Sequence, residues 1–154
     1  MTEYLNNFPY SKPRAEQERA IEFALKAYDE GKRFVIIEAG TGVGKSAIGL
    51  TIAKTIADKA YFITTQKILQ QQYVDDFKNS GILSLKSSSN FRCQYYKGKD
   101  CSQSLRELKV SKDGKFKSTC GGGCVYKNAK RKFIEGSLGI TNFAYFLAET
   151  NYSQ

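Results

Sequence analysis

The feature that most constrains this chain is a glycine-rich segment, Ala39-Gly40-Thr41-Gly42-Val43-Gly44-Lys45-Ser46. It fits the Walker A pattern, with Ala in place of the first Gly. Glycines let backbone N–H groups turn inward around phosphates, and the helix that follows directs its positive end toward them. Lys45 is predicted to reach the β- and γ-phosphates of a nucleotide, and Ser46 to ligate Mg²⁺. The alternative, a chance glycine turn, is disfavoured because the segment lies between an apolar run and an amphipathic helix.

Helical and extended patterns alternate around this loop. Helices are predicted over about 13–30, 45–58, 66–78, 124–133 and 143–149, and strands over 34–37, 60–64, 82–85 and 138–141. Alternating strands and helices are typical of a parallel sheet covered on both faces. The sequence therefore predicts an α/β fold built around a phosphate-binding loop.

The 154 residues include four Cys and no His. Without an imidazole, catalysis has to come from carboxylates, lysine, a metal or bound phosphates. The first ten residues are polar and do not resemble a signal peptide, and the apolar run Phe34–Ile37 is far too short to span a membrane. We therefore expect a soluble intracellular protein with no membrane partner, whose cysteines are metal ligands or free thiols rather than disulfides.

Positive charge is concentrated in one segment. Twelve of the 24 Lys and Arg lie between Arg92 and Lys132 together with three acidic residues, so this segment carries the whole net charge of +9. It also contains several aromatic residues and all four cysteines. Cations that follow phosphates and rings that stack on bases are typical of single-stranded nucleic-acid binding. The alternative is a solvated cationic surface over a small aromatic core.

The cysteines of this segment are spaced Cys93-x7-Cys101-x18-Cys120-x3-Cys124. Four thiolates can hold a [4Fe–4S] cluster or a tetrahedral Zn²⁺. Structural zinc sites usually offer two close pairs, whereas here only the second pair is close. The spacing leaves the cluster, zinc and unrelated buried thiols open.

Loop and basic segment together resemble the XPD/DinG-type iron–sulfur helicases of superfamily 2. The likeness rests on short stretches in the family's order: Phe8-Pro9-Tyr10 with Arg14 and Gln17, Glu38 to Ser46, Thr64-Thr65 with Leu69 to Gln72, Asn90 to Cys93, Cys124 to Tyr126 with Ala129, and Ile140 to Tyr145. The resemblance implies a partial RecA-like motor domain over 1–86, an iron–sulfur insert over 87–133, and a return into the motor domain over 134–154.

The resemblance also implies residue roles. Arg14 and Gln17 would recognise the adenine end of ATP, and Gly40, Thr41, Gly42, Val43, Gly44, Lys45 and Ser46 would bind phosphate and Mg²⁺. The ligands of a [4Fe–4S] cluster, favoured over Zn²⁺ by the resemblance, would be Cys93, Cys101, Cys120 and Cys124. DNA contacts would come from Thr65, Gln72, Arg92, Lys97, Lys99, Lys130 and Arg131. The implied activity is ATP-driven movement 5′ to 3′ along single-stranded DNA, with single-stranded DNA and duplex junctions as partners. Separately from the resemblance, we expect a monomer.

The carboxylates that such enzymes use for hydrolysis are expected downstream of residue 154. The family places them in an Asp-Glu-Ala-His-like motif, whereas the Asp29-Glu30 pair of this chain precedes the loop. We therefore expect an amino-terminal fragment that binds nucleotide and single-stranded DNA without sustained hydrolysis. An alternative is a zinc-stabilised nucleic-acid-binding module with a vestigial loop. A small P-loop kinase is disfavoured, since no acceptor-site base or lid is visible.

Overall fold

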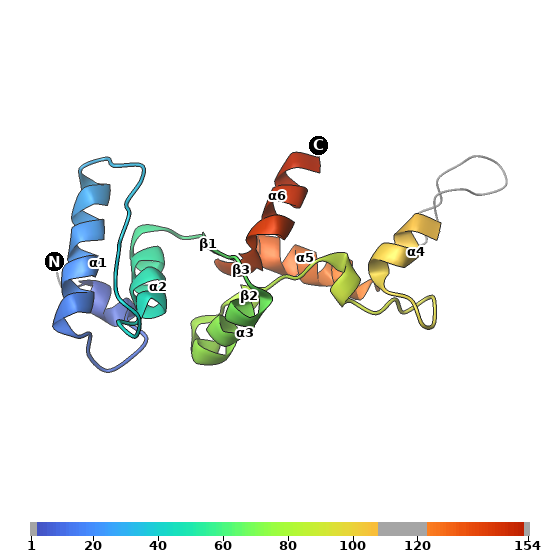
Figure 1. Ribbon diagram of the computed structural model, residues 1–154, viewed down its shortest axis with the longest axis horizontal. Coiled ribbons are helices and arrows are strands. Elements are labelled where there is room, and N and C mark those ends of the chain that lie inside the picture. The colour runs from blue at the N-terminus through green and yellow to red at the C-terminus, as the bar shows by residue number, and fades with distance from the viewer. Residues whose placement is uncertain (1–2, 108–122, 153–154) are drawn as a thin grey trace. The chain divides into compact units, whose positions relative to one another are not determined.

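The computed structural model describes residues 3–107 and 123–152 (Figure 1). The chain divides into two compact units, Met1–Ala60 and Tyr61–Gln154. The first unit contains the glycine-rich loop, and the second contains a small sheet and the basic segment. The domain boundaries predicted at residues 86 and 133 stay predictions. None of the helices in the described ranges is both long and apolar enough to cross a membrane.

The first unit consists of the 3₁₀ helix η1 (Glu3–Asn7) and the helices α1 (Ala15–Asp29) and α2 (Lys45–Ile56). Helix α2 packs on both α1 and η1. The helices predicted over about 13–30 and 45–58 are confirmed, and their buried side chains include Ile21 and Ala24 of α1 and Ile48 and Leu50 of α2. Together these residues form an apolar contact that holds the two helices on either side of the loop.

The run Phe34–Ile37 was predicted as a buried strand, and the structure contradicts this. It has no regular secondary structure, and the side chains of Phe34 and Ile36 are 87% and 90% exposed. Its β-branched and apolar composition favours a strand, but a strand also needs a neighbour that takes up its N–H and C=O groups. No such neighbour pairs with it among residues 3–107 and 123–152.

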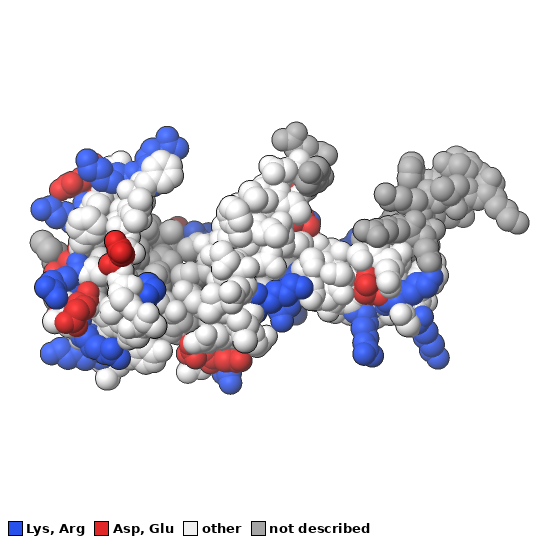
Figure 2. Space-filling model, in the orientation of Figure 1, with Lys and Arg blue, Asp and Glu red and all other residues white. Residues whose placement is uncertain are grey.

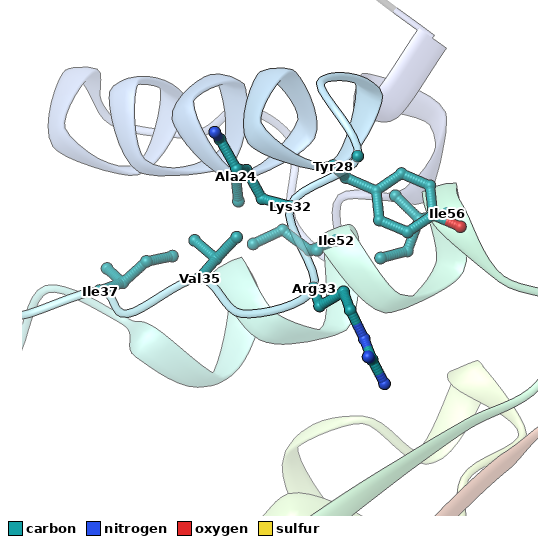
Figure 3. A pocket seen from close by; sticks show the side chains of 9 residues that line it. Ala24, Tyr28, Lys32, Arg33, Val35, Ile37, Ile52 and Ile56 are labelled. Atoms are coloured by element: carbon teal, nitrogen blue, oxygen red, sulfur yellow. The ribbon is translucent and has the colours of Figure 1, made fainter.

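Alternate residues of this run point in opposite directions. Val35 and Ile37 point toward Ile52 of α2 in the pocket shown in Figure 3, whereas Phe34 and Ile36 are turned to solvent. The pocket has a volume of about 740 Å³ and is mainly apolar, with these lining residues: Ala24, Tyr28, Gly31, Lys32, Arg33, Val35, Ile37, Ile52 and Ile56. The pocket is lined by residues of α1, of α2 and of the segment 31–37 that precedes the loop. None of the loop residues Gly40–Ser46 lines it.

The second unit contains a three-stranded sheet in the order β1-β3-β2, where β1 is Ala60–Thr64, β2 is Leu83–Ser84 and β3 is Leu138–Asn142. Strands β2 and β3 are parallel, with Leu83 opposite Gly139. The predicted strands 60–64, 82–85 and 138–141 are thus confirmed. The connection from β2 to β3 contains the whole basic segment, which is therefore an insertion between neighbouring parallel strands.

Helices cover both faces of this sheet. Helices α3 (Lys67–Asp76) and α5 (Val125–Glu135) each pack on β2 and β3, and α6 (Phe143–Tyr152) packs on β3. Tyr61 of β1 contacts Phe133 of α5, whereas its neighbour Phe62 contacts Tyr73 of α3. Adjacent strand residues point to opposite faces, so α5 and α3 lie on opposite sides (Figure 1). The α/β layering predicted from the sequence is confirmed.

Two 3₁₀ helices precede the basic segment: η2 (Lys78–Ser80), just before β2, and η3 (Ser88–Asn90), after it. An antiparallel bridge between Arg92 and Asp100 then closes a loop that leads into α4 (Cys101–Glu107). Helix α4 was not predicted. Asp100 caps it, because the Asp100 carboxylate accepts from Gln103 N at 2.9 Å and the Gln103 side-chain oxygen Oε1 accepts from Asp100 N at 3.1 Å.

Candidate functional site

The glycine-rich loop forms a tight turn that ends as α2 begins. Gly42 and Gly44 have φ values of 82° and 85°, a region that disfavours residues with a Cβ, and Gly44 is the N-cap of α2. Within the described residues, the N–H groups of residues 42–46 have no hydrogen-bond acceptor. Five consecutive residues at the positive end of a 12-residue helix therefore offer N–H donors, which favours the binding of phosphate.

Lys45 and Ser46 occupy the first turn of α2. The Lys45 ammonium is exposed and donates to the carbonyls of Ala39 and Gly40, each at 2.9 Å, so it lies across the mouth of the loop. Ser46 is half-buried in the same turn. The structure thus brings together all seven loop residues predicted to bind phosphate, Gly40 to Ser46, with a cation beside the donors.

Two residues at the start of α1, Arg14 and Gln17, donate hydrogen bonds to backbone carbonyls of the loop. The Gln17 amide accepts from Arg14 N at 2.9 Å through Oε1 and donates to the Val43 carbonyl at 2.9 Å through Nε2. The Arg14 guanidinium donates to the Gly42 carbonyl at 3.3 Å. Both residues predicted from the resemblance therefore lie at the loop, and Gln17 is buried there with 4% of its surface exposed.

The cysteines are only partly assembled. Cys101 and Cys124 are buried in one cluster with Phe91 and Tyr126. Cys93 is half-buried, and a hydrogen bond with Ser104 lowers the pKa of its thiol, favouring the thiolate that metals bind. Among the described residues no three His, Cys, Asp or Glu side chains form a metal-binding group. Cys120 lies outside the described residues.

Three predicted DNA-contacting cations line one pocket in the second unit. Arg92, Lys97 and Lys99 surround a cavity of about 810 Å³, together with Asp100 and the polar residues Ser89, Asn90 and Gln103. Blue side chains project from the surface near α4 in Figure 2. The closing turn contains Gly98, whose φ is 81°, and Cys93 N donates to the Lys99 carbonyl at 2.9 Å. This backbone pairing fixes the three cations around a single concave surface.

The other predicted DNA contacts are spread over the second unit. Thr65 follows β1 and Gln72 lies on α3, and both are exposed. Arg131 of α5 is exposed as well, whereas Lys130 forms an ion pair with Glu149 of α6. The structure therefore groups three of the seven predicted DNA contacts in one pocket and places the other four on separate elements.

A polar network between α5 and α6 was missed by the sequence analysis. The hydroxyls of Tyr126 and Tyr145 are 2.7 Å apart, and the Glu149 carboxylate accepts from Tyr126 at 3.2 Å and from Lys130. Burial raises the pKa of Tyr126 to about 12. These residues lie far apart in sequence and no motif marks them, whereas the missed cap of α4 had a readable signal in Asp100 and Gln103.

Comparison with known proteins agrees with this geometry. Residues 10–133, which include the loop, Arg14, Gln17 and the whole basic segment, match the ResIII family, described as type III restriction enzyme, res subunit. No curated protein and no solved structure matches the chain. Since the match covers well over half of the sequence, the chain belongs to the ResIII family and carries an ATP-binding helicase/ATPase module of superfamily 2 with a partial RecA-like fold.

Proposed function

We propose that this chain binds Mg²⁺-ATP at Gly40–Ser46 and belongs to a motor that moves along single-stranded DNA, 5′ to 3′, as the resemblance to XPD/DinG-type helicases implies. The observation that carries the nucleotide site is the loop itself: at the start of α2, the N–H groups of residues 42–46 have no acceptor in the part of the chain that the structure describes, and Lys45 donates to two carbonyls of the loop. Arg14 and Gln17 complete the site because they contact the loop.

Each loop residue has a distinct part in this site. The backbone N–H groups cradle the phosphates, and the Lys45 ammonium exchanges its bonds to two carbonyls for bonds to the β- and γ-phosphates. The Ser46 hydroxyl is the ligand that this chain offers to Mg²⁺, which would neutralise phosphate charge when bound. Asp29 and Glu30 lie at the carboxyl end of α1 and belong to no part of the loop. This acidic pair therefore has no part in the proposed nucleotide site.

The nucleotide site is tested by calorimetric titration with Mg²⁺-ATP. Lys45→Ala should weaken binding by at least tenfold, because a charge-assisted bond to phosphate contributes about 1.5–3 kcal/mol. Lys54→Ala is the matched control, since it removes an exposed lysine from the same helix and should leave the affinity unchanged. Equal affinities of the wild type and Lys45→Ala would refute the site.

For nucleic acid, we propose that the Arg92, Lys97 and Lys99 pocket is the principal phosphate contact, with Thr65, Gln72, Lys130 and Arg131 contributing. The pocket holds three cations against one carboxylate, and Asp100 already accepts from Ser102 and from Gln103 N. The net charge around this concave surface is therefore positive, which favours a phosphodiester. Lys130 is expected to contribute least, since Glu149 is already its partner.

A salt titration of single-stranded DNA binding tests this surface. Each phosphate contact contributes about 0.7 to the slope of log affinity against log salt, so Lys97→Ala should reduce the slope by about that amount. Arg131→Ala should behave similarly, and Lys130→Ala should change the slope much less. An affinity that is flat from low to physiological salt would exclude phosphate contacts by this segment.

The cysteines are proposed to hold a [4Fe–4S] cluster through Cys93, Cys101, Cys120 and Cys124. The support for this proposal is that Cys101 and Cys124 are buried in one cluster with Phe91 and Tyr126, so two of the four thiols already lie together. The same donors would also suit Zn²⁺. When bound, either metal would cross-link the four cysteines and so stabilise the fold of the basic segment, which has little apolar core of its own.

Metal content and visible absorption of protein purified without oxygen decide between these metals. About four irons with labile sulfide and a brown colour support the cluster, and Cys101→Ser and Cys124→Ser should each abolish both. One zinc without colour would replace the cluster with a zinc-stabilised nucleic-acid-binding segment and leave the nucleotide site unaffected. Protein that contains neither metal would refute metal binding.

A further inference from the structure

We propose that a pocket lined by β1, β3, α5 and α6 holds one unstacked base of a single strand of nucleic acid. The inference rests on the proposed binding of single-stranded DNA and deepens it, because it adds a contact with a base to the proposed contacts with phosphates. All the lining residues belong to the second unit. No sequence motif marks this pocket, since its lining comes from separate elements.

The first observation is the size and the lining of this pocket. It has a volume of about 450 Å³, which is within the range of small-molecule sites. Its mainly apolar lining includes the buried side chains of Leu85, Phe133 and Tyr145. A mainly apolar space with several rings favours a flat aromatic ligand over a sugar or a phosphate.

Rings that could stack on such a ligand come from three elements. Tyr61 of β1 and Phe133 of α5 contact each other, with ring centroids 5.3 Å apart, and Phe146 of α6 is half-buried in the same lining. Every base has a π-face, so stacking on such rings does not depend on the identity of the base. Tyr61 is the most accessible of the two rings in contact, because it is 42% exposed and Phe133 is 8% exposed.

The charged groups of the pocket favour an uncharged ligand. Lys130 and Glu149 both line it and form an ion pair, so their charges cancel. The Glu149 carboxylate also accepts from Tyr126 at 3.2 Å. An ammonium has three N–H groups, and Glu149 takes one of those of Lys130, so this side chain can still donate to an acceptor of a base. A phosphate in the same place would be repelled by Glu149.

The helix beside the pocket suits the phosphates of the same strand. Helix α5 carries four Lys and Arg side chains and one carboxylate, and Arg131, which follows Lys130, is exposed. Cations that follow the backbone next to rings that stack on bases are typical of single-strand binding. We therefore assign the base to the pocket and a neighbouring phosphate to Arg131.

Oligonucleotides with and without bases separate stacking from phosphate contacts. We would measure fluorescence anisotropy with an oligothymidylate and with a strand of equal length made of abasic sites. The wild type should bind the oligothymidylate about tenfold more tightly than the abasic strand. Tyr61→Leu, which keeps an apolar side chain without the ring, should lose most of this preference and bind the abasic strand as the wild type does. The salt dependence should not change, because no charge is removed.

A control and a second variant keep this test decisive. Tyr28→Leu is the matched control, because Tyr28 is 50% exposed on α1 and does not line this pocket, and it should leave both affinities unchanged. If circular dichroism shows that Tyr61→Leu does not fold, Phe146→Leu takes its place. It removes the ring that α6 contributes and should reduce the preference for bases in the same way.

The outcomes separate this inference from the DNA binding on which it rests. Equal affinities of the wild type for the two strands, both weakened by salt, would overturn the base pocket and leave the proposed phosphate contacts intact. An unchanged preference in Tyr61→Leu or, failing that, in Phe146→Leu would also overturn it. Free thymidine that binds as tightly as the oligothymidylate would indicate a site for nucleosides and overturn the assignment to a strand. Wild-type protein that binds neither strand would instead refute the proposed DNA binding.

Discussion

Single polar side chains join elements that are distant in the sequence of this protein. Glu149 of α6 accepts from Lys130 and Tyr126 of α5, and it lies beside Tyr145. Burial acts to raise the pKa of Glu149, but the hydrogen bonds from Lys130 and the tyrosines outweigh it, so the pKa is lowered below 4.5. Burial raises the pKa of Tyr145, so this hydroxyl stays protonated.

Glu149→Gln tests this network through the pH dependence of stability. A carboxyl whose pKa is lowered by folding stabilises the protein fully above its ordinary value of 4.5, and the effect is lost as the pH falls through the lowered pKa. We expect the variant to be less stable than the wild type by about 1 kcal/mol at pH 7, and the difference to vanish in acid. Urea unfolding at several pH values measures it. Glu135→Gln, at an exposed site on α5, is the control, and a difference independent of pH would contradict the account.

At the level of single residues, the sequence predicts the roles of those that belong to a local motif. It does not predict contacts between separate elements. The loop from Gly40 to Ser46 could be assigned because its chemistry requires glycines, lysine and serine at fixed spacing. The bonds of Gln17 to Val43 and of Lys130 to Glu149 could not, because they depend on how separate elements come together in space.

At the scale of elements, periodicity predicted helices α1, α2, α3, α5 and α6 and all three strands of the sheet. Each presents an apolar face whose spacing is readable within the element. The strand predicted over Phe34–Ile37 was wrong, because the composition of this run favours an extended backbone but does not determine whether another strand pairs with it. Helix α4 was missed because it is short and has little apolar periodicity, although Asp100 and Gln103 form a recognisable cap.

The packing of α5 on the sheet depends on a glycine. A Cβ at Gly139 of β3 would lie 2.6 Å from a ring carbon of Phe133 and 2.7 Å from a ring carbon of Tyr61. Gly139→Ala should therefore destabilise the protein by about 1–3 kcal/mol, because two rings that contact each other would have to separate. Chemical denaturation measures this effect, with exposed Ser137→Ala as the control. Unchanged stability would mean that α5 is not packed closely on β3.

At the scale of the whole molecule, the run before the loop has the most exposed large apolar side chains among the residues that the structure describes. Phe34 and Ile36 are almost fully exposed, and the backbone of this run has no strand neighbour among the described residues. An apolar segment with unpaired backbone groups is a template for pairing with another strand. A monomer is expected from the sequence, whereas this surface favours association at high concentration.

Sedimentation velocity over a range of concentrations tests that expectation. We expect reversible association of the wild type, and the double variant Phe34→Ser, Ile36→Ser should suppress it. Phe23→Ser is the matched control, because Phe23 is 59% exposed on α1, whose backbone groups are satisfied within the helix. Association that persists in the double variant would place the contact elsewhere.

The central claim is that the backbone of the glycine-rich loop binds the phosphates of ATP. Amide chemical shifts recorded during titration with Mg²⁺-ATP test it most directly, since each N–H reports on its own hydrogen bond. The account predicts that the largest shifts are those of Gly40 to Ser46, and that they are lost in Lys45→Ala. Shifts centred on the apolar pocket around Ala24, Val35 and Ile52, with the loop unaffected, would contradict it.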